Sequence, residues 1–492
     1  MSFAATFVRR SVRRGVVLGA LLAAAGAAQA DNWFMCAGGN PARNGRSGQA
    51  GPTAPTILWQ SGRPAIIAQE GVAEGNTLVV PRWSDFGSGG WIVGMNLTTG
   101  AELWAVQLPL TTAGSGNNRP TAIRDGRVYC TRSGNDKVEY LYALDAATGQ
   151  QLWRSADFIT ESYTESIAFT ADGDVIASKW VTTNPGTNEL LRFRASDGTV
   201  MWRTPRSVPS SDGLGATVFG DRVYTWEQTP QGPQVTAFNA TSGARLYSTG
   251  SVSGGLVQQG LLMVGPDGTV YAPRFQNNAA TDYFVAYTDT GSAFVEKWRK
   301  PMGYAPFGTY AIGADGSLYT YDVTQTGSTA NLVIRRRDPA TGDETGASGV
   351  ILCDWPPIPR MAADSAGTLY FSNGGFANGR LYSFNADLTE RWSVAVPNIN
   401  TSGPILGQDG TMVVCGIGTD IRAFRTAGPT PCYANCDGST APPILNVNDF
   451  ICFQAKFAAG DSYANCDGST AAPVLNINDF ICFQGRFAAG CR

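Results

Sequence analysis

An alternation of apolar and polar positions, followed by a tight turn, recurs along most of this chain. The clearest copy begins at Tyr142, where Tyr142 and Leu144 alternate with small or polar neighbours, and a second short apolar run ends in Trp153. Strict alternation predicts a half-buried β-strand, because successive side chains of a strand point to opposite faces. Between the runs, Asp145 can hydrogen-bond within its own turn, and Gly149 can adopt the positive φ that ends a tight loop. This segment therefore predicts one β-hairpin.

Copies of this hairpin recur at intervals of about 45 to 50 residues. Seven complete copies can be recognised, and the second strand of each usually ends at an aromatic residue. In chain order, the second strands end at or near Trp104, Trp153, Trp202, Tyr247, Trp298, Thr345 and Trp392. A unit of this length at a constant period is typical of a β-propeller blade. Tryptophan at a fixed place in each unit predicts packing between neighbouring blades.

A second marker, a turn followed directly by a strand, occurs eight times. The copies lie at residues 75–79, 126–129, 173–176, 221–224, 268–271, 316–319, 367–370 and 410–413. The eighth unit stops near Phe424 without a tryptophan strand, whereas Trp59 ends a terminal strand that no unit precedes. Since a closed ring leaves no exposed sheet edge, we expect the N-terminal strand to complete the last blade. We predict an all-β, eight-bladed β-propeller over residues 31–425, closed by the N-terminal strand.

These features resemble the PQQ-like β-propeller repeat proteins, which include eight-bladed quinoprotein alcohol dehydrogenases and BamB-type outer-membrane assembly factors. The resemblance covers about residues 33–425 and rests on residues 144–153, on their copies, and on the opening segment 33–45. The quinoprotein dehydrogenases typically add a vicinal disulfide over the cofactor, a Ca²⁺ site beside it and a catalytic aspartate. This chain has no adjacent pair of cysteines, so those roles cannot be carried over to its residues. The resemblance implies the fold, and a bound PQQ is not favoured.

After a short spacer at residues 426–431, the chain ends in two nearly identical 30-residue repeats. Each repeat has a loop rich in aspartate and asparagine, followed by phenylalanines at helical spacing, as at Phe450, Phe453 and Phe457. The repeated NCDGST and LNVNDF phrases resemble bacterial GC-type dockerin-like tails. The resemblance implies that residues 432–492 form a small α-helical calcium-loop module that docks to a protein partner.

The tail loops carry the donor atoms that a hard cation requires. Ca²⁺ takes about six to eight oxygen ligands from carboxylates, amides, carbonyls and water. The candidate ligands are Asn435, Asp437, Asn446 and Asp449 in the first loop and Asn465, Asp467, Asn476 and Asp479 in the second. Asp449 and Asp479 also stand where a helix begins, so capping and turn formation are the alternative role. The first ligand position of ordinary dockerin loops is Tyr433 or Tyr463 here, which lowers the expected affinity.

The chain has ten cysteines, six of them in the tail. In an exported chain they predict disulfides. Repeat symmetry favours Cys436 with Cys452 and Cys466 with Cys482, which leaves Cys432 and Cys491 to join the ends of the module. Two further bridges could form, in an undetermined pairing, among Cys36, Cys130, Cys353 and Cys415.

The N-terminus predicts export. Four arginines precede an apolar run over residues 16–28, and Ala28 and Ala30 stand at the −3 and −1 positions of a cleavage site, which indicates a signal peptide over residues 1–30. The general secretory route is favoured over the twin-arginine route. Cys36 lacks the small residues that precede a lipidated cysteine, and no later apolar run is long enough to span a membrane.

Composition limits the possible functions. An apolar content of 43%, a charged content of 15% and 59 glycines favour an ordinary globular protein with many short strands and turns. Removal of the signal peptide takes away four arginines and no acidic residue, so the formal charge changes from −3 to −7, which argues against nucleic-acid binding. The chain contains no histidine, which excludes catalytic triads, Cys-His pairs and histidine-ligated zinc or haem.

We therefore expect an exported, non-enzymatic propeller, located in the periplasm, at the cell envelope or outside the cell. One face of the ring would bind a protein or glycan, and the tail would attach the protein to a partner. The alternative is a PQQ-dependent dehydrogenase-like or carbohydrate-acting enzyme with its site over the central channel, where two carboxylates would act as acid and base.

Overall fold

The computed structural model describes a large part of the chain. The described residues are 33, 35–61, 70–82, 90–111, 118–133, 137–160, 167–181, 184–208, 215–251, 258–259, 261–275, 282–302, 308–400, 402–416, 420–426, 433–439, 443–470 and 472–490. The predicted signal peptide, most of the spacer, and Cys432 and Cys491 lie outside them.

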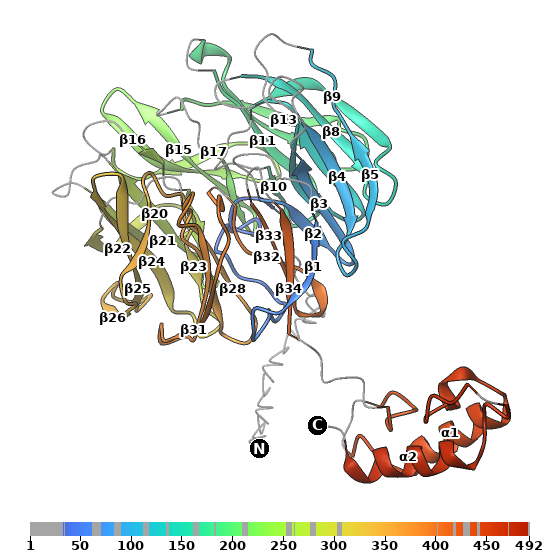
Figure 1. Cartoon of the computed structure of the whole chain (residues 1–492). Helices are drawn as coiled ribbons and strands as arrows, with labels where there is room; N and C mark the ends of the chain where they lie inside the picture. The colour runs from blue at the N-terminus through green and yellow to red at the C-terminus, as the bar shows by residue number, and fades with distance from the viewer. Residues whose placement is uncertain are drawn as a thin grey trace, which may run out of the picture.

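Strands β1 to β34 form eight antiparallel sheets arranged in a ring (Figure 1). Blades one to four contain β2 (Val72–Glu74), β3 (Thr77–Arg82), β4 (Trp91–Asn96) and β5 (Glu102–Val106); β6 (Arg119–Arg124), β7 (Arg127–Thr131), β8 (Glu139–Asp145) and β9 (Gln151–Ile159); β10 (Ala168–Phe169), β11 (Val175–Lys179), β12 (Glu189–Phe193) and β13 (Val200–Pro205); and β14 (Thr217–Phe219), β15 (Arg222–Thr229), β16 (Gly232–Asn239) and β17 (Arg245–Ser248).

Blades five to eight follow the same plan. They contain β18 (Gln258–Gln259), β19 (Met263–Val264), β20 (Thr269–Phe275), β21 (Tyr283–Asp289) and β22 (Phe294–Pro301); β23 (Ala311–Ile312), β24 (Leu318–Thr326), β25 (Thr329–Arg337), β26 (Glu344–Ala347) and β27 (Ile351–Asp354); β28 (Arg360–Ala363), β29 (Leu369–Ser372), β30 (Arg380–Phe384) and β31 (Glu390–Ala395); and β32 (Ile405–Leu406), β33 (Thr411–Cys415), β34 (Ile421–Arg425) and β1 (Ile57–Ser61). Short 3₁₀ turns lie at η1 (Pro185–Thr187), η2 (Gln408–Gly410) and η3 (Ser462–Ala464).

Burial separates the inner strands from the outer ones. The first strands, such as β6 and β28, are almost fully buried, whereas the fourth strands, such as β5 and β13, expose alternate side chains to solvent. The inner strands therefore surround the channel, and each outer strand exposes one face to solvent.

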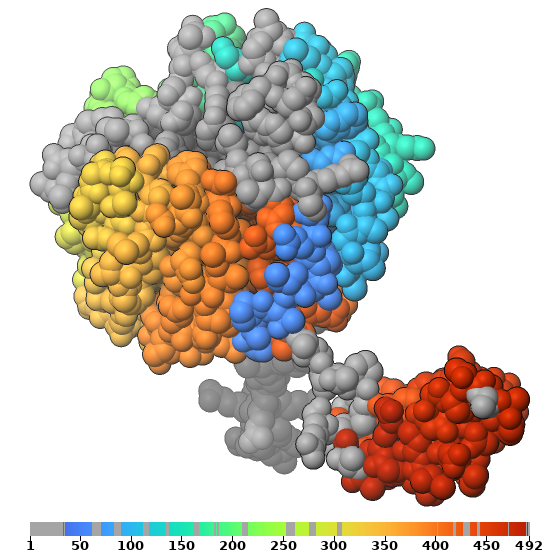
Figure 2. Space-filling model, viewed as in Figure 1, coloured from blue at the N-terminus to red at the C-terminus, as the bar shows by residue number. Residues whose placement is uncertain are grey.

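The N-terminal strand closes the ring. β1 pairs antiparallel with β34, so that Trp59 lies opposite Ala423, and β1 takes the outer position in blade eight. Figure 2 shows this blue segment seated on the surface between the orange last blades and the paler blue first blades. The predicted eight-bladed propeller closed by its N-terminal strand is confirmed.

A tryptophan contact joins neighbouring blades. Trp104 on β5 donates its Nε1 hydrogen to the carbonyl of Ala146 in the turn of the next blade, at 2.9 Å. A β-bulge accompanies this arrangement, because the register between the last two strands shifts next to the hairpin turn, as between Ala143 and Leu144. The equivalent donors and acceptors are Trp59 with Leu97, Trp153 with Ala195, Trp202 with Ala240, and Trp298 with Pro339. The predicted packing of tryptophan between blades is confirmed.

Three blades depart from this contact, and in one of them, blade six, the outer strand β26 has no tryptophan. Tyr247 replaces the tryptophan and donates its hydroxyl hydrogen to Asp289 in the next turn. The Nε1 of Trp392 is buried and has no acceptor among the described residues. The reason lies in blade eight, where β34 and β1 come from opposite ends of the chain and no hairpin turn joins them to supply a carbonyl.

The tail contains two short helices, α1 (Val447–Ala458) and α2 (Ile477–Ala489), which confirm the helical spacing of its phenylalanines. Phe453 and Phe483 are buried and stack at a centroid distance of 4.2 Å. Tyr433 and Tyr463 stack at 4.8 Å, and each donates its hydroxyl hydrogen to the backbone carbonyl of the other. The two repeats therefore form one symmetric aromatic core.

The cysteines agree with the sequence in part. Disulfides join Cys436 to Cys452 and Cys466 to Cys482, as repeat symmetry predicts. The two further bridges are wrong, because the remaining four described cysteines are buried thiols placed on different strands and loops of the ring: Cys36, Cys130, Cys353 and Cys415. Among the described residues, no helix is long and apolar enough to cross a membrane.

Candidate functional site: the channel mouth and the tail loops

The segment that precedes β1 crosses the channel of the ring. Its backbone carbonyls accept hydrogen bonds from the inner strands of five blades, and one of its N–H groups donates to a sixth. The accepting bonds are Ala73 to Trp33, Val218 to Pro41, Val264 to Ala42, Ile312 to Asn44 and Ala363 to Gly45, at 2.7 to 2.9 Å, and Cys36 donates to Thr121 at 3.2 Å. The segment thus fastens six blades to one strip of backbone and forms a floor across the channel.

Local sequence explains how this strip fits so narrow a space. Gly38 and Gly39 have φ values of +77° and +73°, and a Cβ at Gly39 would lie 2.4 Å from the ring of Trp33. Arg43 is buried and donates through Nε to the carbonyl of Ala216 at 2.8 Å. Each of these contacts needs a small residue or a long donor at one position, so the strip is rigidly held.

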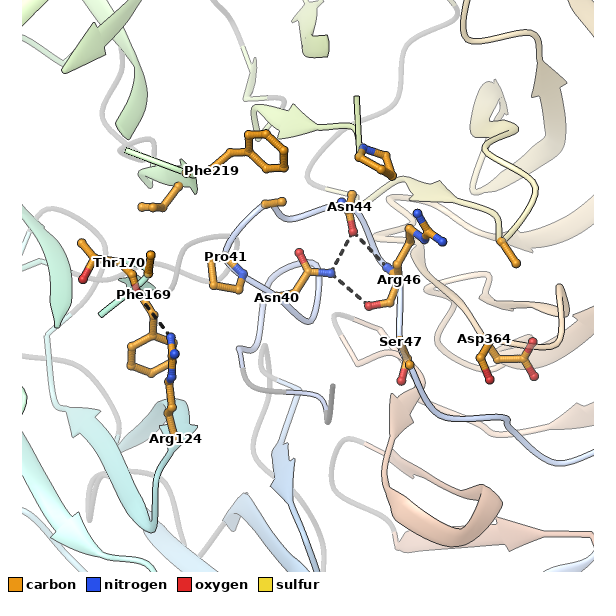
Figure 3. A pocket seen from close by; sticks show the side chains of 18 residues that line it. Asn40, Pro41, Asn44, Arg46, Ser47, Arg124, Phe169, Thr170, Phe219 and Asp364 are labelled. Carbon is orange, nitrogen blue, oxygen red and sulfur yellow. Dashed lines mark hydrogen bonds between the residues drawn. The ribbon is translucent and has the colours of Figure 1, made fainter. Parts of the chain in front are cut away.

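A cavity of about 720 Å³ lies on one side of this floor. Its walls come from successive blades at the point where the first strand ends. Residues at this point are Arg124, Phe169, Phe219, Pro266, Ala314 and Asp364, and the floor is built from residues 40–48 (Figure 3). The volume lies within the range of about 300 to 1,000 Å³ that is usual for small-ligand sites.

The cavity presents fixed polar groups beside aromatic carbon. Asn40 donates through Nδ2 to Asn44 Oδ1 at 2.8 Å and to the carbonyl of Arg46 at 3.0 Å, which orients its amide (Figure 3). The Oδ1 atom of Asn40 accepts no hydrogen bond from the described residues. Arg124 lies over the ring of Phe169, with its guanidinium carbon 5.4 Å from the centroid. An amide, guanidinium groups and aromatic faces are groups that bind polar organic ligands.

Asp364 is the single carboxylate among the described residues that line the cavity. It is buried and accepts hydrogen bonds from the backbone N–H groups of Gly51, Ala366 and Thr368 and from the hydroxyl of Tyr370. Because four donors already hold it, Asp364 positions the N-terminal segment. No second carboxylate occurs among the described lining residues. This lining suits recognition of a ligand.

A buried ion pair lies at the other ends of the inner strands. Glu70 Oε1 is 3.0 Å from Arg360 Nε, and both side chains are 2% exposed. Trp33 donates through Nε1 to Glu70 Oε2 at 3.2 Å. Burial raises the pKa of Glu70 to about 7, although Arg360 and the Trp33 hydrogen bond act in the opposite direction. The cluster joins blades one and seven to the floor segment.

Neither the cavity nor the ion pair is evident from the sequence. Glu70 and Arg360 are far apart in the chain and belong to no shared spacing motif, so only the closure of the ring brings them together. The wall residues of the cavity have a weak signal, since each directly precedes or begins the turn of a repeat.

In the tail, hydrogen bonds connect three of the four candidate ligands of each loop. Asn446 is the N-cap of α1 and accepts a hydrogen bond from Asn448 N at 2.8 Å. Asp449 is buried, and it accepts from Asn446 N at 2.8 Å and from Asp437 N at 3.3 Å. The second loop repeats these contacts with Asn476, Asn478, Asp479 and Asp467. The alternative role as N-caps is shifted by three residues, because Asn446 and Asn476 are the N-caps and Asp449 and Asp479 are the third residues of the capping boxes.

Hydrogen bonds to the backbone keep these carboxyl groups acidic. The Ser439 N–H lowers the pKa of Asp437 below its usual value. Burial acts to raise the pKa of Asp479, but the N–H groups of Asn476 and Asp467 outweigh it and lower the pKa. Both carboxylates therefore stay charged at neutral pH.

In each loop, one asparagine side-chain oxygen could bind a cation. Asn435 donates through Nδ2 to the carbonyl of Ser439 at 2.8 Å, while its Oδ1 is buried and has no hydrogen-bond partner within the described ranges. Asn465 repeats both observations with Ser469. A buried carbonyl oxygen without a donor costs about 1 to 3 kcal/mol, so a cation ligand would satisfy it. No group of three or more His, Cys, Asp or Glu side chains placed to hold a metal occurs in the described part of the chain, so such a site would rely on amides, carbonyls and water.

Comparison with known proteins gives the family and the fold. The family described as "Outer membrane protein assembly factor BamB" matches residues 56–344, more than half of the chain. No curated protein sequence matches. The solved structure of a quinohemoprotein alcohol dehydrogenase from Comamonas testosteroni is similar, with a TM-score of 0.56, 13% identity, and coverage of 85% of this chain and 86% of that chain.

Two further solved structures are similar. A europium-containing methanol dehydrogenase has a TM-score of 0.54 and 14% identity, and the match covers 80% of this chain and 98% of that chain. BamB from Moraxella catarrhalis has a TM-score of 0.48 and 12% identity, over 75% of this chain and 100% of that chain. At such identities, the likeness to the two dehydrogenases shows the fold alone.

Proposed function

Because this chain belongs to the family described as outer membrane protein assembly factor BamB, we propose that it is an exported binding propeller. In this proposal it binds a protein or glycan partner at the channel mouth and acts without catalysis. The dockerin-like tail attaches it to a partner at the cell envelope or in an extracellular assembly.

The observation that carries this proposal is the floor across the channel. A strip of backbone bonded to six blades turns the channel into a blind cavity of about 720 Å³ with preformed walls. A rigid concave site needs little ordering when a ligand arrives, which favours affinity. Its described side chains supply an oriented amide, guanidinium groups and aromatic faces, and its one carboxylate is engaged in holding the floor.

The tail contributes the attachment. Asn435, Asp437, Asn446 and Asp449 would hold one Ca²⁺, and Asn465, Asp467, Asn476 and Asp479 would hold a second. The support is the buried Oδ1 of Asn435 and of Asn465, which no group in the described part of the chain satisfies. A bound cation would fix each loop against its helix, since Asp449 and Asp479 already connect the two. In this proposal, the ordered loops present the docking surface.

A catalytic role has one observation in its favour. Glu70 has its pKa raised to about 7 by burial, so its carboxyl group retains a proton near neutral pH, as a general acid requires. However, the side chain is 2% exposed and is held by both Arg360 and Trp33. We therefore assign Glu70 to fastening the ring, and we keep a quinone-dependent or carbohydrate-acting enzyme as the second candidate.

Two experiments on the mature full-length chain separate these functions. Screening on an array of bacterial and plant glycans, and crosslinking to purified envelope proteins, identify the ligand. Incubation with PQQ and Ca²⁺, followed by gel filtration and a near-ultraviolet spectrum, tests for the quinone. We expect a bound glycan or protein and no retained quinone; a stoichiometric quinone band would overturn the binding assignment in favour of the enzyme.

A further inference from the structure

A second cavity, of about 410 Å³, opens between blades four and five. One wall is the segment that follows β17, at Thr249, Gly250 and Ser251. The other wall is formed by side chains of β20, β21 and β22, namely Arg274, Tyr287, Phe294, Glu296 and Arg299. We call this cavity the blade-five cleft; it is separate from the channel mouth and from the tail.

The cleft occurs where the repeat is altered. Blade four carries Tyr247 in the place of the usual tryptophan. In blade five, Trp298 lies seven positions after Gly291, whereas Trp153 lies four positions after Gly149. The additional residues include Phe294, whose ring packs against Tyr247 at a centroid distance of 5.2 Å. These changes place new side chains along the seam between the two blades.

Two guanidinium groups face this cleft. The guanidinium carbons of Arg274 and Arg299 lie 5.8 Å and 5.3 Å from the centroid of Tyr283. Arg274 is only 8% exposed, and burial followed by the like charge of Arg299 lowers its pKa. Asp282, which is buried and does not line the cleft, acts on Arg274 in the opposite direction and is the smallest of these influences. Arg274 and Arg299 therefore bring two guanidinium groups to one wall of the cleft.

The carboxylate in the cleft orients one of the guanidinium groups. Glu296 receives two hydrogen bonds from Arg299, at 2.7 Å from Nη2 and at 3.2 Å from Nε. This leaves Nη1 of Arg299 outside the fork and sets the plane of the group. Among the described lining residues, Glu296 is the single acid, against two arginines.

We propose that the blade-five cleft binds an oxyanion, a carboxylate or a sulfate ester, carried on a ligand the size of one or two sugar units. Arginine recognises both oxyanions through paired N–H donors. The hydroxyl groups of Thr249 and Ser251 lie on the facing wall, and Tyr287 and Phe294 offer apolar surface for the body of the ligand. The cleft volume of about 410 Å³ accommodates a ligand of this size.

Isothermal titration calorimetry of the mature full-length chain at low ionic strength tests the proposal. The probes are trigalacturonate for the carboxylate, galactose 6-sulfate for the sulfate ester, inorganic sulfate for the bare anion, and maltotriose as the neutral sugar. We expect one of the two acidic sugars to bind at least about tenfold more tightly than maltotriose, since a charge-assisted bond contributes about 1.4 kcal/mol or more. Equal affinity for acidic and neutral sugars, or binding of inorganic sulfate alone, would overturn it.

Variants locate the binding. Arg299→Ala should lower the affinity for the acidic sugar about tenfold. Glu296→Gln should raise that affinity, because it removes the carboxylate that competes with the ligand for Arg299. Arg194→Ala is the matched control, because Arg194 pairs with Asp197 three residues away, as Arg299 pairs with Glu296, and both arginine side chains are more than 40% exposed. Unchanged affinity in Arg299→Ala, or an equal loss in Arg194→Ala, would show that the blade-five cleft is not the site. Since Arg299 and Glu296 do not line the channel mouth, the result with these variants distinguishes the blade-five cleft from the site of the proposed function.

Discussion

The indole of Trp104 lies so close to Gly149 of the next blade that a Cβ at position 149 would be 2.7 Å from the ring. The indole also donates its Nε1 hydrogen to Ala146, in the same turn. One side chain thereby requires both a glycine and a free carbonyl in the following repeat, which explains why the turn and the tryptophan recur together. The same pair of contacts locks successive blades around the ring.

Replacement of Gly149 by alanine should destabilise the ring more than a change of backbone conformation alone would. Gly149 and Gly126 both have φ +71°, but a Cβ at Gly126 would meet nothing within 4 Å. Gly126→Ala should cost about 1 to 2 kcal/mol for the left-handed conformation, and Gly149→Ala about 1 to 3 kcal/mol more for the clash with the indole. Thermal unfolding of both variants measures the difference; equal midpoints would contradict the locking role of Trp104.

Stability should depend on pH through Glu70. Its pKa is raised from 4.5 to about 7 in the folded protein, so the folded state binds more protons than the unfolded state between these values. The stabilising contribution of the protonated carboxyl is complete below about pH 4.5 and is lost as the pH rises through about 7. We expect the unfolding midpoint of Glu70→Gln to vary less than that of the wild type over this window. Identical slopes for the two proteins would show that Glu70 does not titrate there.

Calcium binding should depend on Asn435 and Asn465. Their Oδ1 atoms have no hydrogen-bond partner among the residues that the structure describes. The double variant Asn435→Ala and Asn465→Ala therefore removes two candidate ligands and keeps both helix caps. We expect calorimetry to show about two Ca²⁺ per wild-type chain, with affinity at least about tenfold lower in the variant. The matched control is Asn448→Ala with Asn478→Ala, since these exposed residues meet the cap through backbone N–H alone. The absence of any heat of binding in the wild type would contradict the proposal that the tail binds Ca²⁺.

The four buried cysteines of the ring should be unreactive until the protein unfolds. Burial raises the pKa of the Cys353 and Cys415 thiols to about 12, which leaves almost no thiolate at neutral pH. Iodoacetamide should therefore label Cys36, Cys130, Cys353 and Cys415 in guanidinium chloride without a reductant, and leave them unlabelled in the native protein. Mass spectrometry of the peptides reads out both states, and a disulfide between any two of the four would contradict the structure.

The repeats made most of the fold predictable, because each blade is specified locally. Alternation, turn glycines and tryptophan spacing lie within about 50 residues of one another, and the displaced Trp59 identified the closing strand. The symmetry of the tail gave its two described disulfides in the same way.

The features that the sequence did not reveal depend on contacts across the ring. The floor segment bonds to strands as distant as β28, and Glu70 meets Arg360 only because blades one and seven approach the same channel. The blade-five cleft results from a substitution at Tyr247 and an insertion before Trp298, which look like degeneration of the repeat in the sequence. The four ring cysteines, expected in disulfides, fill the core as small apolar side chains.

The central claim is that the floored channel mouth is the binding site of the propeller. The most direct test compares how tightly three proteins bind the ligand that the screen identifies. These proteins are the wild type, the double variant Arg124→Ala with Phe219→Ala, and the surface control Phe376→Ala. The side chain of Phe376 is 39% exposed on blade seven. We predict that the double variant binds at least about tenfold more weakly, while the control is unchanged. Equal affinity in all three proteins would contradict the claim.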